Sequence, residues 1–377
     1  MNFLFIHQNF PGQYLHLAPA LASMGNNCIA IGSQTSKSTS NIKLFKYIWD
    51  IKKYTENSEI HRWLSDFNLK IIRAELVAEI LLKLKKENFK PDLIIGHPGW
   101  GELLAVKDIF PGIPVLQQFE FFYQLNNADH NFDPEFRKSN WDDNTRLRLR
   151  RASQLLSLTD LDYAISPTKW QAQTAPEIFS NKIRIIHEGI NTEVLSPNKK
   201  NASIKLKKSN LIFSHGDEII SYVARNLEPY RGFHSFMRML PLLQQKRPNC
   251  HVIIVGEDKV SYGSPPSNGG TWRKLLIDEL SGELDLSRIH FVGRVSRSTL
   301  TNLFQVTACH VYLTYPFVLS WSLLEAMSCQ ASIVASDTSP VKEFLKHNEN
   351  CFLVDFFDYK QIAEGICETL KNKKLSE

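Results

Sequence analysis

Short apolar runs alternate with amphipathic segments along the whole chain, and this alternation predicts two α/β domains. At the start, FLFI precedes a turn-rich HQNFPGQ, a helix-period segment YLHLAPALASMG and the apolar run CIAIG. This order is that of a parallel βαβ unit, with Gly25 as the expected helix C-cap. The runs PDLIIGH, IPVLQQF, DYAISPT and KIRIIHEGI, with helices expected over 69–86 and from Gly101, continue the series. Continuous apolar strands between helices predict a doubly wound sheet covered on both faces.

The pattern breaks over 191–215, a polar, lysine-rich stretch that we expect to connect two domains, 1–200 and 201–377. A second series follows, with strands EIISYVARN, CHVIIVGED, RIHFVGRV, CHVYLTYP, ASIVASD and CFLVDF. Helices are expected between them over 233–243, 271–279, 297–305 and 322–329. Two successive Rossmann-like domains of similar size predict a ligand cleft between them.

Composition and charge exclude several classes of protein. Of the 377 residues 43% are hydrophobic and 22% charged, and no apolar run is long enough to span a bilayer. The first residues lack the basic region of an export signal, so we expect a cytoplasmic protein. The six cysteines form no C-x-x-C pair, and no structural metal is expected. A net charge of +5 argues against a nucleic-acid binder but allows peripheral contact with an acidic inner membrane face.

Candidate chemistry follows the apolar runs, because ligands of open α/β sheets bind at the carboxyl ends of strands. In VARNLEPYRG, Arg225 and Arg231 precede a helix, which is the arrangement of a diphosphate clamp. A pair of surface arginines is the alternative. The Gly-, Pro- and Ser-rich segment 258–274 follows a strand and is either an exposed insertion or a substrate-contacting lid.

The segment YPFVLSWSLLEAMSC predicts a second ligand-binding loop at a helix start. Backbone N–H groups of Leu319, Ser320 and Trp321 would face an anion, and Glu325, expected on the first helical turn, would accept from ribose hydroxyls. The general preference of acidic residues for a first turn is the alternative explanation. In the first domain, the tight turn at Gly12 lets the backbone approach a ligand, with Gln13 as a donor.

Motifs of other enzyme classes are missing from the sequence. HQNFPGQ lacks the G-x-G-x-x-G spacing of a dinucleotide site, and there is no P-loop, G-x-S-x-G or H-E-x-x-H. In combination, HQNFPGQ, IHEGINTEVLSP, VARNLEPYRG, VIIVGE, IHFVGRV and SLLEAMSCQASIVASDTSPVKEFL resemble the family-4 retaining glycosyltransferases of the GT-B fold over nearly the whole chain. The resemblance implies sugar transfer from a nucleotide donor to an acceptor hydroxyl, with retained configuration and without an obligatory metal or cofactor.

The resemblance also implies roles for individual residues. Arg225 matches the family's phosphate-binding arginine, and Arg231 stands where a lysine is usual. Gly12 matches the loop that approaches the donor phosphate. Glu325 matches the second glutamate of a two-glutamate motif, which holds the nucleotide ribose. His97, in GHPGWGE, lies where the family often places a polar residue near the acceptor or sugar hydroxyls, a structural histidine being the alternative.

Further positions match or depart from the family. Arg294 and Val295, after FVG, match the segment whose backbone meets the nucleobase. Phe317 replaces the first motif glutamate, and Val318 and Ser320 replace the usual glycine pair. The resemblance therefore implies no carboxylate beside the donor sugar at this position, and the donor's own phosphate would serve as base.

Two features of the first domain rank lower as functional candidates. Glu120, in QFEFFY, follows another expected strand. An arginine-rich stretch is either a solvated helix face or a surface for an anionic acceptor or a membrane. Its arginines are Arg146, Arg148, Arg150 and Arg151.

We therefore expect a metal-independent hexosyltransferase in which Arg225, Arg231 and His97 are catalytic. It would move a sugar from a UDP- or GDP-sugar to a hydroxyl of a glycan, lipid-linked or protein acceptor, as in polysaccharide biosynthesis. A catalytically silent GT-B scaffold is an alternative that Phe317 favours. A sugar-nucleotide epimerase, which would need cleft acids for proton abstraction, is a weaker one.

Overall fold

The computed structural model describes residues 1–55, 59–137, 140–198, 200–206 and 210–371. The chain divides into two compact units, unit 1 (Met1–Gly189) and unit 2 (Ile190–Glu377). The division falls at the beginning of the expected connection, whereas the sequence analysis placed it at 200. Residues 138–139 of the arginine-rich stretch and residues 199 and 207–209 of the connection lie outside the described residues.

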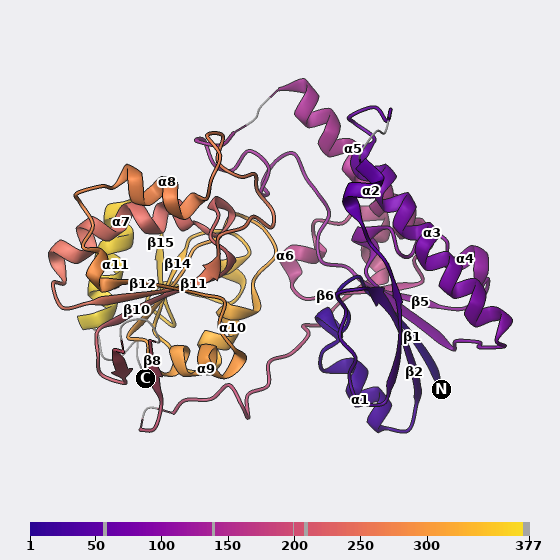
Figure 1. Cartoon of the computed structure of the whole chain (residues 1–377), viewed down its shortest axis with the longest axis horizontal. Coiled ribbons are helices and arrows are strands. Elements are labelled where there is room, and N and C mark those ends of the chain that lie inside the picture. The colour runs from indigo at the N-terminus through magenta and orange to yellow at the C-terminus, as the bar shows by residue number, and fades with distance from the viewer. Residues whose placement is uncertain (56–58, 138–139, 199, 207–209, 372–377) are drawn as a thin grey trace. The chain divides into compact units, whose positions relative to one another are not determined.

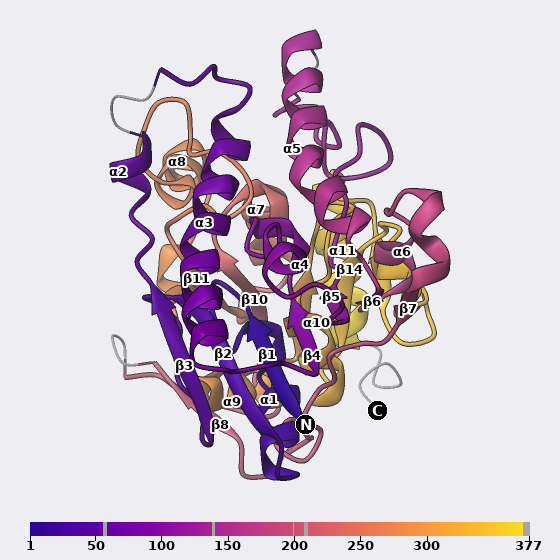
Figure 2. The same cartoon turned by 90° about the vertical axis from the view of Figure 1, so that its right-hand side faces the viewer.

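Figure 1 shows the whole chain. Unit 1 contains a parallel, seven-stranded sheet with the order β3-β2-β1-β4-β5-β6-β7 (Figure 2). Its strands are β1 (Asn2–Ile6), β2 (Asn27–Ser33), β3 (Ile42–Tyr47), β4 (Leu93–Gly96), β5 (Val115–Gln118), β6 (Tyr163–Ser166) and β7 (Ile183–Ile185). Its helices are α1 (Leu17–Ser23), α2 (Ile51–Thr55), α3 (Ser65–Lys86), α4 (Val106–Ile109), α5 (Trp141–Thr159) and α6 (Lys169–Ala172).

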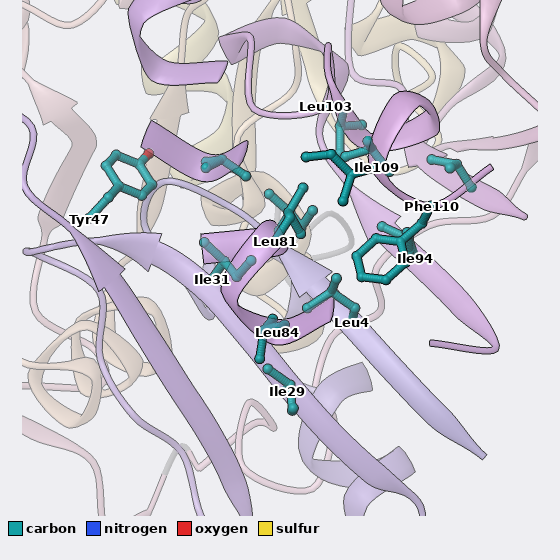
Figure 3. Packing of buried hydrophobic residues seen from close by; sticks show 14 residues of the cluster. Leu4, Ile29, Ile31, Tyr47, Leu81, Leu84, Ile94, Leu103, Ile109 and Phe110 are labelled. Atoms are coloured by element: carbon teal, nitrogen blue, oxygen red, sulfur yellow. The ribbon is translucent and has the colours of Figure 1, made fainter. Parts of the chain in front are cut away.

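Alternate residues of the buried strands supply two cores, one on each face of this sheet. Leu4 and Ile6 of β1 pack with Leu81 and Leu84 of α3. Figure 3 shows Leu4 pointing toward Leu81 and Leu84. Phe3 and Phe5 of β1 pack instead in the core that contains residues of α1. Figure 2 shows α3 along one face of the sheet. Because both faces are covered, the central strands β1 and β4 are mostly apolar, as the sequence predicted.

Two expectations for unit 1 need correction. The strand β3 was not anticipated, because IKLFKY mixes apolar residues with lysines; it pairs in parallel with β2 at the sheet edge. The helix expected from Gly101 is wrong, because only the four residues of α4 are helical there. Gly101 has φ 92°, and an added Cβ would lie 2.2 Å from the Lys70 carbonyl oxygen, so the chain makes a tight turn at this point.

Unit 2 contains a parallel, six-stranded sheet with the order β12-β11-β10-β13-β14-β15 and a two-stranded sheet of β8 and β9. Its strands are β8 (Ser203–Lys205), β9 (Ile212–Ser214), β10 (Ile219–Asn226), β11 (His251–Glu257), β12 (Ile289–Gly293), β13 (Cys309–Tyr312), β14 (Ile333–Ser336) and β15 (Phe352–Val354). Its helices are α7 (Phe233–Lys246), α8 (Trp272–Glu279), α9 (Arg297–Val306), α10 (Trp321–Ser328) and α11 (Tyr359–Lys371).

Helices cover both faces of the larger sheet. Figure 1 shows α7, α8 and α11 on one side and α9 and α10 on the other. On β10, the ring of Tyr222 packs against that of Phe236 of α7, with centroids 4.6 Å apart and the ring planes tilted by 33°. The adjacent Val223 packs with the cores on the opposite face. Both units are therefore doubly wound α/β folds, as predicted. Across the described residues, no helix is both long and apolar enough to cross a membrane.

The expected connection between domains is in part a structured element of unit 2. β8 and β9 pair antiparallel, and their Ile204 and Phe213 are buried in the core that includes Leu303 of α9. Leu195 is buried in a neighbouring core of the same unit. Isolated apolar residues among lysines carried no helical or strand period, which is why the sequence analysis took this stretch for a linker.

Candidate functional site

Polar side chains from three adjacent strand ends meet in unit 1. His7 follows β1, His97 follows β4, and Glu120 lies two residues beyond β5. The His97 Nε2 and Glu120 Oε2 atoms are 3.2 Å apart, and the Gln13 side-chain amide donates to the other Glu120 oxygen. The His7 and His97 rings meet edge to face at 6.1 Å. We call His7, Gln13, His97 and Glu120 the unit 1 polar cluster.

The hydrogen bonds of His97 fix its tautomer. Its Nδ1 accepts from the Gly99 backbone N–H at 3.0 Å, so the ring proton sits on Nε2 and is donated to Glu120. The ring stacks on Trp100 with centroids 5.3 Å apart. This histidine is therefore held in one orientation. The sequence alone allows either a functional or a structural role for it.

Burial and hydrogen bonding set the charges of the unit 1 polar cluster. Burial, reinforced by the neighbouring His97, lowers the pKa of His7 to about 4, so this imidazole is neutral at pH 7. For Glu120, burial would raise the pKa, but the hydrogen bonds from His97 and Gln13 outweigh it and the pKa is lowered. The cluster therefore presents a carboxylate surrounded by donors. Glu120 lies at its centre, although the sequence analysis ranked it low.

The loop that carries Gln13 is shaped by two neighbours. Gly12 has φ 49°, and a Cβ at this position would lie 2.4 Å from the His7 ring, so only glycine fits. Glu102 accepts from the Gln8 backbone N–H at 3.0 Å and from the Tyr47 hydroxyl at 2.7 Å. Burial raises the pKa of Glu102, with these hydrogen bonds opposing the shift. Glu102 thus holds the loop in place through its hydrogen bond with the Gln8 backbone. No motif in the sequence indicates this role.

In unit 2, Arg231 lies buried at the turn between β10 and α7. Its Nη1 donates to the Thr314 hydroxyl at 2.8 Å and to the Val318 carbonyl at 3.0 Å. Its guanidinium carbon lies 5.4 Å from the Tyr262 ring centroid and 5.8 Å from that of Phe317. The arginine is therefore fixed in a socket of hydrogen-bond acceptors and aromatic faces.

Phe317, which stands in place of the motif glutamate, belongs to this socket. Phe317 is buried, and its ring centroid lies 5.5 Å from that of Tyr230 and 4.9 Å from that of Tyr262. Aromatic side chains thus occupy the place where the family usually has the first motif glutamate. Arg231, which replaces the usual lysine, lies over the ring of Phe317, so these two departures from the family pattern are in contact.

The loop after β11 is tied to the same turn. The buried carboxylate of Glu228 accepts from the backbone N–H groups of Ser261, Tyr262 and Gly263 at 3.0–3.2 Å. The aromatic contacts of Tyr262 then place this part of segment 258–274 against Arg231. The start of the segment is exposed at Ser261 and Tyr262, and its backbone is held against the turn after β10.

The loop before α10 differs in detail from expectation. Ser320 is the N-cap of α10, and its own N–H donates to the Tyr312 hydroxyl at 2.9 Å. Glu325 lies beyond the first helical turn, which holds no acidic residue, so the expected position on that turn is wrong. The carboxylate is buried and pairs with Arg297 Nη2 of α9 at 2.6 Å. No motif in the sequence indicates this ion pair.

The other predicted residues of unit 2 lie near strand ends and at the start of α10. Arg225, near the end of β10, and Arg294, directly after β12, have exposed side chains. Val295 packs against the core that contains residues of β11, and Leu319 packs against the core that contains residues of α10. Trp321 begins α10 and is partly buried.

The arginine-rich stretch of unit 1 forms part of α5. Arg146, Arg148 and Arg150 are exposed, as a solvated helix face predicts. The guanidinium carbons of Arg150 and Arg151 also lie over the rings of Tyr123 and Phe122, at 5.5 and 5.6 Å from the ring centroids. Part of this charge is therefore used in packing within unit 1.

Two family models match the chain. Residues 24–195 match the glycosyl transferase family 4 group, and residues 204–377 match the glycosyl transferases group 1. The chain belongs to the group 1 glycosyltransferases. The matched ranges include Arg231, Phe317 and Glu325 of this glycosyltransferase, whereas His7 and Gly12 precede them.

Solved structures share the fold at low sequence identity. Sucrose-phosphate synthase from Thermosynechococcus elongatus has a TM-score of 0.70 at 16% identity, covering 100% of this chain and 91% of its own. Anabaena Alr3699/HepE in complex with UDP and glucose has a TM-score of 0.66 at 17% identity, with the same coverage. A UDP-forming trehalose-phosphate synthase from Burkholderia xenovorans has a TM-score of 0.61 at 13% identity, covering 98% and 90%. The fold is therefore GT-B, as expected. No curated protein matched the sequence.

Proposed function

We propose that this glycosyltransferase moves a hexose from a UDP-sugar, or failing that a GDP-sugar, to a hydroxyl of a glycan, lipid-linked or protein acceptor, with retention and without a metal. The observation that carries the proposal is the buried guanidinium of Arg231, held by Thr314 and Val318 at the carboxyl edge of the unit 2 sheet. A UDP donor is favoured because solved structures of this fold hold UDP or UDP-glucose.

Arg231 suits a site for a leaving diphosphate. The two bonds to Thr314 and Val318 both come from its Nη1, and a guanidinium has five N–H donors. Since these bonds and the aromatic walls already orient the group, it needs little reorganisation when negative charge develops on the donor. Exposed Arg225 would add a second positive charge from the end of β10.

The proposed transfer requires only the nucleotide sugar and the acceptor. The acceptor oxygen forms a bond to the anomeric carbon while the bond from that carbon to the donor phosphate breaks. The acceptor proton passes to the departing phosphate oxygen, which therefore acts as the base. Arg225 and Arg231 compensate the charge of the leaving nucleoside diphosphate, which is the part that a divalent cation plays in other transferases.

His97 is proposed to contact a hydroxyl of the transferred sugar or the acceptor. A hydroxyl there would share the Nε2–H that His97 donates to Glu120, since Nδ1 is used by Gly99. Gln13 and Glu120 would supply a further donor and an acceptor beside it. In the unit 2 site, Glu325 would accept from ribose hydroxyls, and the backbones at Leu319, Trp321, Arg294 and Val295 would approach the diphosphate and the base.

A second candidate is a silent nucleotide-binding or scaffold protein of the same fold. The packing of Phe317 favours it, because no carboxylate stands at that position beside Arg231. We prefer the enzyme because a scaffold has no need of the buried arginine Arg231 after β10 and the buried glutamate Glu325 in α10.

Thermal stabilisation by a panel of UDP-, GDP-, ADP- and CMP-sugars tests the proposal. We expect one donor to raise the melting temperature, since a ligand at 100 times its Kd stabilises the folded state by about 2.7 kcal/mol. Arg225→Ala should remove most of this shift. Arg184→Ala, which changes an exposed arginine of β7, is the matched control and should keep it. No shift with any nucleotide sugar in well-folded protein would refute the transferase and leave the scaffold.

A further inference from the structure

The buried carboxylate of Glu325 has an unusual partner. Its side chain is 2% exposed, whereas that of Arg297, which donates to its Oε1 at 2.6 Å, is 63% exposed. A buried carboxylate is costly unless it is paired or bonded, so the structure must supply such a partner. Arg297 reaches it from a different helix, α9, whereas Glu325 belongs to α10.

The location of Arg297 is unfavourable for a cation. It is the first residue of α9, directly after the N-cap Ser296, where the helix dipole opposes positive charge. A neutral residue at this position would avoid that cost, and an apolar residue in place of Glu325 would avoid the buried charge. A need to hold the carboxylate in one position explains why this chain has both charges.

We infer that Arg297 is a positioning residue that orients Glu325 to accept the 2′ and 3′ hydroxyls of a ribonucleotide. The inference rests on the proposed function, because it concerns the nucleotide half of the same donor site. A carboxylate has about four lone-pair directions, so one oxygen can accept from Arg297 while the group still accepts from a ribose diol. Fixing Oε1 removes the rotation that would otherwise be lost on binding. The site should therefore prefer ribonucleotides over 2′-deoxyribonucleotides, and this preference should depend on Arg297.

Isothermal titration with UDP and 2′-deoxy-UDP measures this preference, and GDP with 2′-deoxy-GDP serves if the protein binds guanine nucleotides. For the unaltered chain we expect UDP to bind about tenfold more tightly, as one lost hydrogen bond to a charged group implies. Arg297→Ala should weaken UDP about tenfold and bring the two affinities close together. Arg297→Lys, which keeps a cation near Glu325, should restore part of the preference.

The control variant is Arg288→Ala, which breaks another ion pair of the same unit, to Asp285, with the same separation of 2.6 Å. It should leave the ratio of the two affinities unchanged. In Glu325→Gln protein the ratio should already be small, and adding Arg297→Ala should change it little, because both residues act through one carboxylate.

The outcomes separate this inference from the proposed function. If the unaltered protein binds ribonucleotide and Arg297→Ala lowers only the melting temperature while the ratio stays the same, the pair is merely structural and the inference is wrong. The proposed function would survive that result. If the unaltered protein binds none of the four nucleotides, the proposed function fails and the inference fails with it.

Discussion

Single residues of both units are held by partners that lie far from them in the sequence. In unit 1, His97 donates to Glu120, and Gln13 donates to the same carboxylate. In unit 2, Arg231 is fixed by Thr314 and by the carbonyl of Val318. Each of these groups has a definite orientation before any substrate arrives, which is the condition for electrostatic catalysis without reorganisation.

The buried His7 should make stability depend on pH. Its pKa is about 4 in the folded protein against an ordinary 6.5, so between these values the unfolded chain binds more protons. The stabilisation is therefore complete above pH 6.5 and is lost as the pH falls toward 4. Urea unfolding should show His7→Asn protein losing about 2–3 kcal/mol less than the unaltered chain between pH 7 and pH 4.5.

Asparagine is chosen because its side-chain oxygen can replace His7 Nδ1 as the acceptor for the Asn9 N–H. His16→Asn, at an exposed position, is the control and should keep the pH dependence of the unaltered chain. Equal pH dependence of His7→Asn and unaltered protein would show that His7 is not neutralised by burial.

The sequence predicted the positions of candidate site residues better than their hydrogen-bond and ion-pair partners. Following strand ends led to His97, Arg231 and Glu325, since an apolar run reveals where a strand stops. The contacts of Glu325 with Arg297 and of His97 with Glu120 join segments 28 and 23 residues apart, and no local pattern encodes them. A buried carboxylate such as Glu102 is likewise invisible until its neighbours are known.

Among the elements, the loops after the strands do most to shape the sites. Glu228 of the turn after β10 holds the loop after β11 through three backbone N–H groups. Tyr262 of that loop then covers Arg231. One buried carboxylate therefore couples two loops that belong to neighbouring strands.

Replacing Glu228 by glutamine should loosen this loop. A carboxamide keeps the size but offers one acceptor oxygen and places an NH₂ group against backbone donors, so we expect a loss of about 1–3 kcal/mol. Hydrogen exchange should become faster at Ser261, Tyr262 and Gly263. Glu279→Gln removes the partly exposed pair with Arg238 and should cost at most about 1 kcal/mol with no change at those amides. Unchanged exchange in Glu228→Gln protein would contradict the anchoring role.

The elements themselves could largely be read from the sequence. Long apolar runs gave the central strands of both sheets, and Gly25 follows α1 with φ 82° as a C-cap glycine should. The edge strand β3 and the hairpin of β8 and β9 escaped, because half-exposed strands carry lysines among their apolar residues. The helix expected from Gly101 failed because backbone packing against Lys70 imposes a turn there.

The whole molecule consists of two doubly wound units, each with polar residues gathered at the carboxyl edge of its sheet. Unit 1 offers a neutral histidine and a hydrogen-bonded carboxylate, and unit 2 offers a buried guanidinium and a buried glutamate. This division matches an acceptor and sugar side on unit 1 and a nucleotide side on unit 2, which is the division that the proposed transfer requires.

The most direct test of the central claim follows the reaction by proton NMR with the stabilising nucleotide sugar and an acceptor, in the presence of EDTA. We predict release of nucleoside diphosphate and a product whose anomeric coupling matches that of the donor. Arg231→Ala should slow the release about 100-fold, because it removes a positive charge that compensates the leaving diphosphate. An unchanged donor after prolonged incubation, or turnover unaffected by Arg231→Ala, would contradict the account.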